Sequence, residues 1–350
     1  MNKENIYDLD NYNFFLPKEL IAQLPPQKRS DCKLLVYFIK ENSVRHLKFS
    51  DIVDILDDKW CIILNNTKVE PRKIECRKIS GGIIPILITY YSDNLIKFIP
   101  YKRLNYNQKL ILPDGKIANV IRKNNETLEW ELEGDFSASD IKKIINDYGL
   151  APLPPYIKRK PKDPLYALDA KEYQTVFAKI PCSLAAPTAG FHFDKDIIER
   201  LEKKRVKIVY ITLNIGLSTF KPVKTKDIRE HKIFPEELII DKTTADVINM
   251  YVKNNKNILC VGTTVVRSVE FLATKFGEIK EYKGPVDIYI YPGYKFKVVK
   301  HLLTNFHLPK STNLLLVAAL IGRDKLLELY NVAIEKKYKF YSYGDAMLII

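Results

Sequence analysis

The feature that most constrains the fold is a change of pattern between residues 69 and 134. Short β-rich runs alternate there with turn signals, such as those at residues 80–82 and 113–115, and residues 127–133 alternate strictly between apolar and polar. Strands this short at this spacing are typical of an antiparallel barrel or sandwich. The flanking sequence mixes helix and strand patterns, so we expect a small β domain inserted into a larger one.

Helices and strands alternate beyond residue 170. Asp194 is expected to cap the first helix, and Gly277 to end the last one. Such alternation implies parallel strands joined by crossover helices. The expected elements are a helix at 194–205, a strand at 206–213, a helix at 241–253, a strand at 258–261 and a helix at 264–276.

The predicted fold class is therefore α/β. Residues 1–65 and 152–350 are expected to form a mixed, largely parallel α/β domain, and residues 66–151 an inserted antiparallel β domain. A helix capped by Ser139 should close the insertion. The proline-rich segment that follows, residues 152–162, is either a plain linker or a basic contact to a phosphate backbone.

Composition bounds the function only loosely. The net charge of +14 favours a polyanionic partner, although a lysine-rich composition explains it equally well. Five scattered cysteines without a Cys-x-x-Cys pair fit a reducing cytoplasm and argue against a zinc site. No apolar run is long enough to cross a bilayer. Glycine-rich dinucleotide, Walker A and Gly-x-Ser-x-Gly motifs are absent, which disfavours nicotinamide oxidoreductases, P-loop kinases, α/β-hydrolases and Rossmann-type methyltransferases.

Three segments lie where a strand is expected to pass into a helix: residues 185–193, 261–270 and 306–312. Small or hydroxyl residues in them leave backbone N–H groups open at a helix N-terminus, where a carboxylate or phosphate binds well. Because ligands of such sheets bind beyond the carboxyl ends of the strands, these segments are the candidate site.

Arg267 is the unusual residue of the second segment. A cation in the first turn of a helix opposes the helix dipole. Either an anionic ligand compensates for it, or an internal acid does, such as Glu270 three residues further on. Both explanations remain open from the sequence.

Two histidines, His192 and His307, lie in the first and third segments. A single histidine is more often structural than catalytic, but two at one sheet edge favour a site. They lack the spacing of metal ligands, so no metal is expected. Asp345, after Gly344 near the C-terminus, either caps a turn or binds ribose hydroxyls.

Taken together, the motifs resemble those of one family, the S-adenosylmethionine:tRNA ribosyltransferase-isomerases of queuosine biosynthesis. The resemblance covers most of the chain. It is most specific in AAPTAGFHF (185–193), VGTTVVRSVE (261–270), YPGYKF (291–296), TNFHLPKST (304–312) and YGDAML (343–348). Weaker similarities are FFLPKELIAQ (14–23), LNNTKVEP (64–71), PLPPYIKR (152–159) and EYQTVFA (172–178).

The resemblance implies a specific activity. Such enzymes move the ribosyl part of S-adenosylmethionine onto 7-aminomethyl-7-deazaguanine at the tRNA wobble position and rearrange it to the epoxycyclopentane of epoxyqueuosine, while adenine and methionine leave. It also implies an α/β domain with an inserted β-barrel, S-adenosylmethionine as cosubstrate without a metal, the tRNA anticodon loop as partner, and a cytoplasmic monomer.

This chemistry assigns roles to the candidate residues. The sulfonium acidifies the ribose C5′ protons, so a histidine with a pKa near 7 suits the base. A cation and open N–H groups suit the methionine carboxylate, and an acid suits a ribose or base edge. The resemblance thus implies three catalytic residues, His192, His307 and Glu270, and six that bind the cosubstrate, Thr188, Gly190, Thr263, Thr264, Arg267 and Asp345.

The chain departs from the family pattern at several positions. Asn66 and Lys68 replace the usual Asp and Arg, and Lys73 replaces an Arg. Residues 214–221, beginning with Asn214, replace the usual His-Val-Gly-Ala-Gly-Thr-Phe-Arg, and Phe234 replaces a histidine. An Arg→Lys change loses a bidentate fork, and Asn66 cannot act as a base, so turnover or tRNA contacts are expected to change.

Two other functions fit the sequence. The first is a basic RNA-binding protein of the same fold that has lost the chemistry, which would not bind S-adenosylmethionine. The second is an S-adenosylmethionine-dependent tRNA methyltransferase, which would release S-adenosylhomocysteine instead of adenine.

Overall fold

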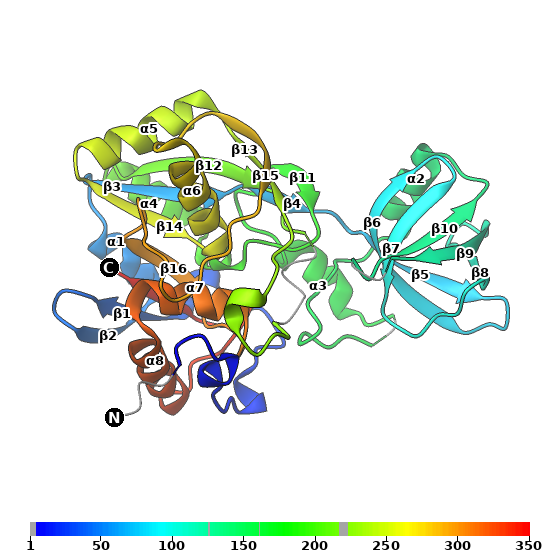
Figure 1. The fold of residues 1–350 in the computed structure, drawn as a ribbon, viewed down its shortest axis with the longest axis horizontal. Helices are drawn as coiled ribbons and strands as arrows, with labels where there is room; N and C mark the ends of the chain where they lie inside the picture. Colours follow the sequence, from blue (N-terminus) through cyan, green and yellow to red (C-terminus); the bar gives the residue numbers. More distant parts are fainter. Residues whose placement is uncertain (1–4, 125–126, 161, 217–222) are drawn as a thin grey trace. The chain divides into compact units, whose positions relative to one another are not determined.

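The chain forms two compact units in the computed structural model, which describes residues 5–124, 127–160, 162–216 and 223–350. The larger unit comprises Met1–Lys68, Pro155–Lys158 and Gln174–Ile350, and the smaller one Val69–Pro154 and Arg159–Tyr173 (Figure 1). Residues 159–173 thus group with the insertion and not, as the sequence led us to expect, with the larger domain. The bond from the Lys73 ammonium to the Tyr166 hydroxyl, 2.7 Å long, ties this segment to the insertion.

A nine-stranded sheet, ordered β15-β13-β12-β3-β14-β16-β17-β1-β2, forms the centre of the larger unit. Its central strands β12, β3, β14 and β16 are parallel to one another, whereas β17 is antiparallel to β16 and parallel to β1. The mixed, partly parallel fold class predicted from the sequence is confirmed. The strands are β1 (Lys33–Phe38), β2 (Ser43–Lys48), β3 (Trp60–Asn65), β12 (Lys207–Leu213), β13 (Glu236–Ile240), β14 (Asn257–Val261), β15 (Tyr282–Val286), β16 (His301–Asn305) and β17 (Ala346–Ile349).

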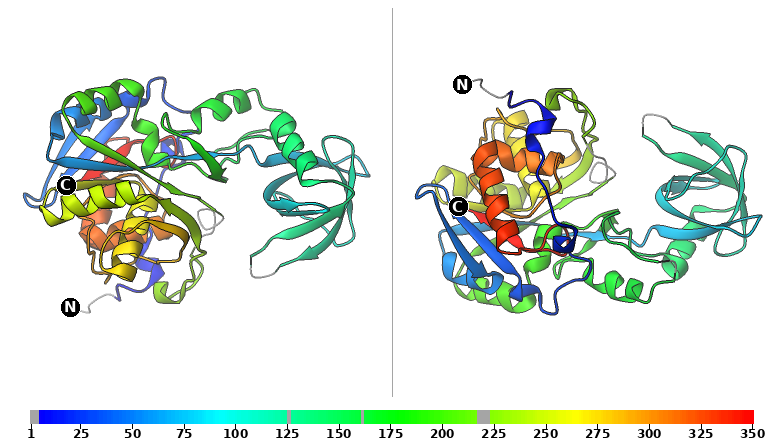
Figure 2. Two further views of the ribbon diagram at one scale, coloured as in Figure 1. Left: turned by 90° about the horizontal axis from the view of Figure 1, so that it is seen from above. Right: turned by 90° about the horizontal axis from the view of Figure 1, so that it is seen from below.

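Helices cover both faces of this sheet (Figure 2). Apolar side chains of α5, α6, α7 and α8 pack into one core, and those of α1 and α4 into the other. Because side chains alternate along a strand, Leu302 of β16 joins the first core and Leu303 the second. The helices are α1 (Ile52–Ile55), α4 (Lys195–Lys203), α5 (Lys242–Lys253), α6 (Thr263–Phe276), α7 (Thr312–Ile321) and α8 (Arg323–Glu335).

Short elements complete the larger unit. The 3-10 helices of the described residues lie in its connections: η1 (Leu9–Tyr12), η2 (Lys18–Leu20), η3 (Arg29–Asp31), η4 (Phe49–Asp51), η5 (Thr188–His192) and η7 (Ile228–Glu230). Strands β4 (Thr67–Val69) and β11 (Ile180–Ser183) form a separate two-stranded sheet.

The C-terminal residues lie in the middle of the fold. All four residues of β17 are buried, because the strand pairs with β16 on one side and β1 on the other. The apolar run that ends the chain is therefore core.

The smaller unit is a closed antiparallel barrel with strand order β10-β7-β6-β5-β8-β9 (Figure 1). Helix α2 packs Ile141, Ile144 and Ile145 into the barrel core. The strand pattern alone left barrel and sandwich open, the family resemblance predicted an inserted antiparallel β-barrel, and the structure confirms the barrel. Its elements are β5 (Lys73–Lys78), β6 (Ile83–Ser92), β7 (Leu95–Pro100), β8 (Lys109–Ile111), β9 (Ile117–Lys123), β10 (Trp130–Gly134), α2 (Ala138–Tyr148) and α3 (Leu165–Glu172).

Part of the proline-rich segment is fixed on the larger unit. The Gln23 side-chain amide donates to the Tyr156 carbonyl (2.8 Å) and accepts from the Lys158 N–H (3.0 Å), much as a neighbouring strand would. Residues 156–158 are therefore held in place. Within the described ranges, no helix has the length and apolar character needed to cross a membrane.

Candidate functional site at the carboxyl edge of the sheet

The first candidate segment differs from its expected form. Residues 188–192 form the 3-10 helix η5, and the preceding strand β11 pairs with β4 outside the main sheet. The α-helix that follows begins at Lys195 with the Asp194 carboxylate as its cap, as expected. The Gly190 N–H donates to the Pro187 carbonyl, and a Cβ at Gly190 would lie 2.7 Å from the Phe177 ring. Gly190 is therefore a packing residue, and its N–H is not open to a ligand.

Asn305, at the carboxyl end of β16, connects the first segment to the sheet. Its amide oxygen accepts a hydrogen bond from the Thr188 hydroxyl (2.8 Å). Its amide nitrogen contacts His192 Nε2 (3.3 Å) and the Tyr341 carbonyl (3.1 Å). Thr188 and His192 thus meet at the strand end predicted to bind a ligand.

His307 lies at the same strand end but on the other face. Its Nε2 is 2.7 Å from the hydroxyl of Thr304, which neighbours Asn305 in β16 and so points to the opposite side of the sheet. The His307 backbone N–H donates to the Tyr330 hydroxyl (2.8 Å), which fixes the start of the loop. The two histidines therefore approach one edge of the sheet from its two faces.

Both imidazoles are neutral near pH 7. Burial lowers the pKa of His192 to about 3, and the positive charge of Arg29 acts in the same direction. Burial also lowers the pKa of His307 to about 3. Neither is tuned near 7, as the sequence argument assumed for a base, because no carboxylate faces either ring among their described contacts. Both are nevertheless in the protonation state that a base or a neutral donor needs.

The second segment has the expected form, with helix α6 beginning directly after β14. Gly262 stands between them with φ of 92°, a value that favours glycine. The Thr263 hydroxyl donates to Asn313 on α7 (3.0 Å), whereas the buried Thr264 hydroxyl has no hydrogen-bond partner. The Val265 N–H donates to the Gly262 carbonyl (3.2 Å), so the open N–H groups of this first turn are those of Thr263 and Thr264, which precede the first bond of the helix.

Arg267, one turn further along α6, is buried with 7% of its surface exposed. Its Nη1 bonds Glu236 of β13 at 2.6 Å, and its Nε donates to the Ile288 carbonyl (3.2 Å). Its Nη2 is buried without a partner. An unpaired buried donor costs about 1–3 kcal/mol, so a ligand that accepts from Nη2 would be bound favourably.

Glu270 is not the acid that pairs with Arg267. Its two carboxylate oxygens accept from the backbone N–H groups of Lys297, Val298 and Val299 and from the Tyr294 hydroxyl. This wholly buried carboxylate fixes the loop before β16. Both oxygens are occupied by these hydrogen bonds, so the contacts of Glu270 indicate a structural role and not a catalytic one.

Asp345 caps a turn, one of the two roles that the sequence allowed. Its two oxygens accept from the N–H groups of Lys33 and Lys339 at 2.7 Å each. Burial raises the pKa of this carboxyl, and these two hydrogen bonds oppose the shift. The contacts hold the C-terminal turn against β1 and give Asp345 a structural role.

The departures from the family pattern have structural contexts. Asn66 follows β3, and its side-chain oxygen accepts from the Thr212 hydroxyl (2.6 Å), a bond that an aspartate would also make. Lys68 is exposed, while the Lys73 ammonium lies 5.0 Å from the ring centres of Tyr101 and Tyr166. Asn214 and Phe234 are partly buried, and the changes at 217–221 lie outside the described residues.

Sequence reasoning missed two residues of this edge, Asn305 and Glu236. Asn305 lies inside a quoted motif, and a polar residue at the end of an apolar strand was the signal that should have singled it out. Glu236 is 4% exposed, and its other oxygen accepts from the Gly216 N–H (3.1 Å). No local pattern marks Glu236, because its partner Arg267 is distant in the sequence. Among the described residues, no cluster of His, Cys, Asp and Glu is arranged to hold a metal ion.

Comparison with known proteins agrees with the motifs. A family model described as queuosine biosynthesis protein matches residues 9–349. A protein of Sulfurihydrogenibium sp. (strain YO3AOP1), named S-adenosylmethionine:tRNA ribosyltransferase-isomerase, is 43% identical over 98% of this chain and 99% of its own length. A protein of that name from Clostridioides difficile (strain 630) is 39% identical over 97% of this chain and 98% of its own length.

A solved structure is also similar. It is the crystal structure of an S-adenosylmethionine tRNA ribosyltransferase from Thermotoga maritima, with a TM-score of 0.56 and 28% identity over 97% of this chain and 100% of that one. The fold and these matches define the class of the protein as a transferase. The chain belongs to the queuosine biosynthesis protein family, as its motifs predict.

Proposed function

We propose that this protein transfers the ribosyl moiety of S-adenosylmethionine to 7-aminomethyl-7-deazaguanine at the tRNA wobble position and isomerises it to the epoxycyclopentane of epoxyqueuosine. Adenine and methionine are the released products. The proposal is supported by relatives of that name that match almost the whole chain. It is also supported by polar groups at the carboxyl edge of the sheet that lack partners.

The observation that carries the proposal is the start of α6. Arg267 Nη2 and the Thr264 hydroxyl are buried without partners, and the helix N-terminus adds open N–H groups and a positive potential. A carboxylate, with two acceptor oxygens, is the group that suits such a set of donors. We assign this position to the methionine carboxylate, with Thr263 holding α6 against α7.

The two histidines fit the other end of the cosubstrate. A C5′ proton next to the sulfonium must be removed, and the departing adenine needs a hydrogen-bond donor or a proton. Neutral imidazoles supply an acceptor and a donor, respectively. Since the wobble base belongs to a single-stranded loop, it reaches such an edge without melting a duplex.

The test is incubation of the protein with S-adenosylmethionine and tRNA that carries 7-aminomethyl-7-deazaguanine. We expect free adenine in the supernatant and a wobble nucleoside whose mass corresponds to epoxyqueuosine. S-adenosylhomocysteine together with a methylated tRNA would make the protein a methyltransferase. Failure to bind S-adenosylmethionine in calorimetry, with tRNA still bound, would make it an RNA-binding protein.

A further inference from the structure

The amide of Asn305 has only one orientation that satisfies its neighbours. Asn305 is 2% exposed, and the carbonyl of Tyr341, 3.1 Å away, can only accept a hydrogen bond. The amide nitrogen must therefore face that carbonyl, and the amide oxygen faces the Thr188 hydroxyl, which donates to it. The orientation of the side chain follows from these two contacts alone.

The second N–H of the same amide faces His192. The distance from the amide nitrogen to Nε2 is 3.3 Å, so Nε2 must present a lone pair for a hydrogen bond to form. A neutral imidazole with a lone pair on Nε2 carries its proton on Nδ1. An imidazolium would point an N–H at an N–H, which the geometry disfavours.

The surroundings of the His192 ring also favour the neutral imidazole. His192 is 2% exposed, its ring centre is 5.2 Å from that of Phe49, and the nearby charge is that of the Arg29 guanidinium. An apolar ring and a cation both oppose a positive charge on the imidazole. The lone pair of Nε2 is thus used inside the protein, and Nδ1–H remains for a ligand.

We infer that Asn305 is a positioning residue that holds His192 as its Nδ1–H tautomer, so that His192 serves the reaction as a hydrogen-bond donor and not as the base. The chemical half of this inference rests on the proposed function. A donor of this kind suits a lone pair of the departing adenine. The base that removes the C5′ proton is then His307, the other histidine of the edge.

His307 meets the requirement for a base. Its Nε2 contacts the Thr304 hydroxyl, which can donate or accept a hydrogen bond. This contact is therefore compatible with either tautomer of the His307 ring. Its Nδ1 has no hydrogen-bond partner among the described residues, and the side chain is partly exposed. Nδ1 is free to take the proton while Thr304 accepts the one on Nε2.

The tautomer is measured directly by two-bond nitrogen–proton correlation spectra of the full-length protein labelled with ¹⁵N-histidine. The chain has five histidines, and the signal of His192 is identified by its loss in His192→Gln. We expect a neutral ring with the proton on Nδ1 that persists from about pH 8 to about pH 5.5. A ring protonated on Nε2, or an imidazolium in this range, overturns the inference.

Two substitutions test whether Asn305 sets the tautomer. In Asn305→Asp the carboxylate can only accept, so the proton should move to Nε2 of His192. In Thr188→Val the Tyr341 carbonyl still orients the amide, so the spectrum should not change. An unchanged tautomer in Asn305→Asp, or a switch in Thr188→Val, contradicts the assignment. Unchanged signals of the distant His46 and His301 report that each variant is folded.

Activity measurements distinguish a failure of this inference from a failure of the proposed function. We expect His307→Gln to lower kcat for adenine release by about a hundredfold or more, because the variant has no base. His192→Gln keeps an N–H donor and should lower kcat less, and the reverse order overturns the assignment. If the wild type releases no adenine, the proposed function fails while the spectra still decide the tautomer.

Discussion

Arg267 offers the clearest test at the level of single residues. If Nη2 binds the methionine carboxylate, then losing it removes a charge-assisted bond of about 1.5–3 kcal/mol, so the KM for S-adenosylmethionine should rise about tenfold to a hundredfold. Arg267→Lys keeps the charge but loses the forked guanidinium, so its KM for S-adenosylmethionine should lie between those of the wild type and Arg267→Gln.

Arg267→Gln alone also removes the cation that faces the buried Glu236 carboxylate, which destabilises the fold. The double variant Arg267→Gln/Glu236→Gln removes both charges and is the matched control. We expect the double variant to recover thermal stability without recovering the KM. A KM that returns to the wild-type value would mean that Arg267 acts only through packing.

The two histidines with lowered pKa predict how stability depends on pH. An unfolded histidine has a pKa near 6.5, whereas burial lowers the pKa of His192 and of His307 to about 3. Between these values the unfolded chain binds more protons than the folded one, so the free energy of unfolding falls as pH falls. Urea unfolding at pH 7.5, 6 and 5 should show this slope, and His192→Gln should reduce it. An equal slope in both proteins would show that His192 is not neutral in the folded state.

Residues whose partners are local or lie at a strand end could be placed from the sequence. His192, Arg267 and His307 do lie at the carboxyl edge of the sheet. Glu270 and Asp345 were assigned to the site because an acid in a motif looks functional, whereas their acceptors are satisfied by backbone N–H groups. Those groups belong to segments such as Lys297–Val299 and Lys33, which only the folded chain brings together.

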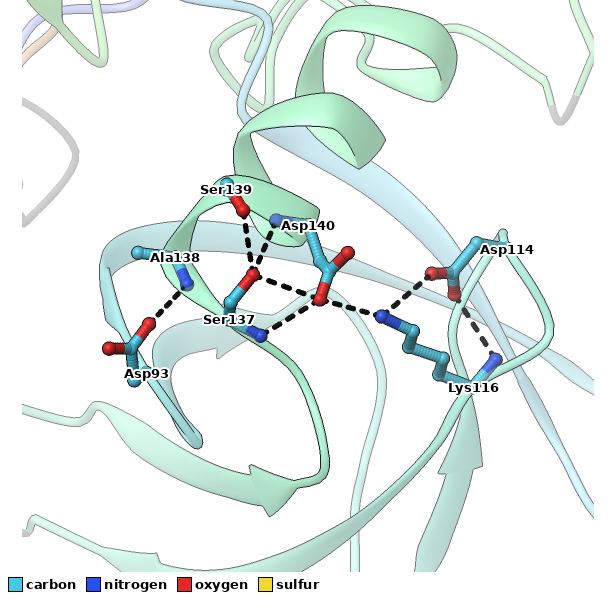
Figure 3. A network of polar contacts seen from close by, with 7 residues as sticks. All are labelled: Asp93, Asp114, Lys116, Ser137, Ala138, Ser139 and Asp140. Carbon is cyan, nitrogen blue, oxygen red and sulfur yellow. Dashed lines mark hydrogen bonds and ion pairs between the residues drawn. The ribbon is translucent and has the colours of Figure 1, made fainter.

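At the level of elements, the start of α2 is defined by a capping box (Figure 3). The Ser137 hydroxyl accepts from the Asp140 N–H, and the Asp140 carboxylate accepts from the Ser137 N–H. Lys116 approaches the same carboxylate at 2.7 Å. Ser137, not Ser139 as predicted, is therefore the cap.

Ser137→Ala should lower the free energy of unfolding by about 1 kcal/mol, because the first-turn N–H of Asp140 loses its acceptor. Ser139→Ala is the matched control and should cost less than about 0.5 kcal/mol. The fluorescence of Trp130, in a Trp60→Phe background, follows urea unfolding of the barrel. Equal midpoints for the two alanine variants would contradict the role of Ser137.

Element predictions succeeded where a cap or a glycine marks an end. Asp194 and Asp241 cap their helices, and Gly277 ends α6 in the left-handed conformation. They failed where tertiary pairing decides. The alternation at 127–133 predicted a half-exposed strand, but β10 begins at Trp130 and Glu131 is buried by Arg122 and its neighbours. The first candidate segment was expected to join a strand of the main sheet to the helix after Asp194, whereas β11 pairs with β4 and η5 lies between β11 and α4.

At the level of the whole molecule, most of the net positive charge belongs to the larger unit. Lys and Arg exceed Asp and Glu by 39 to 28 in the larger unit and by 17 to 14 in the barrel unit. Because the larger unit is also more than twice as long, the share of Lys and Arg is similar in the two units, so a lysine-rich composition and a polyanionic partner both remain explanations of the charge. The sequence could give the total charge, whereas its division required the two units.

The proposed tRNA partner predicts how binding depends on salt. Phosphate contacts release counterions, so affinity should fall about a hundredfold between about 50 and 200 mM salt if about four phosphates are contacted. The exposed Lys68 and Lys179 lie near Asn66, whose carbonyl accepts from the Lys179 N–H, and they are candidates for two of these contacts.

Replacing both lysines, in Lys68→Gln/Lys179→Gln, should reduce the slope of log affinity against log salt by about 2. The control is Lys142→Gln/Lys143→Gln, which removes the same charge from the exposed face of α2 in the barrel. If tRNA binds through the larger unit, this control should leave the slope close to that of the wild type. A flat salt dependence in the wild type, or an equal effect of the two double variants, would show that bulk charge and not a defined phosphate footprint governs binding.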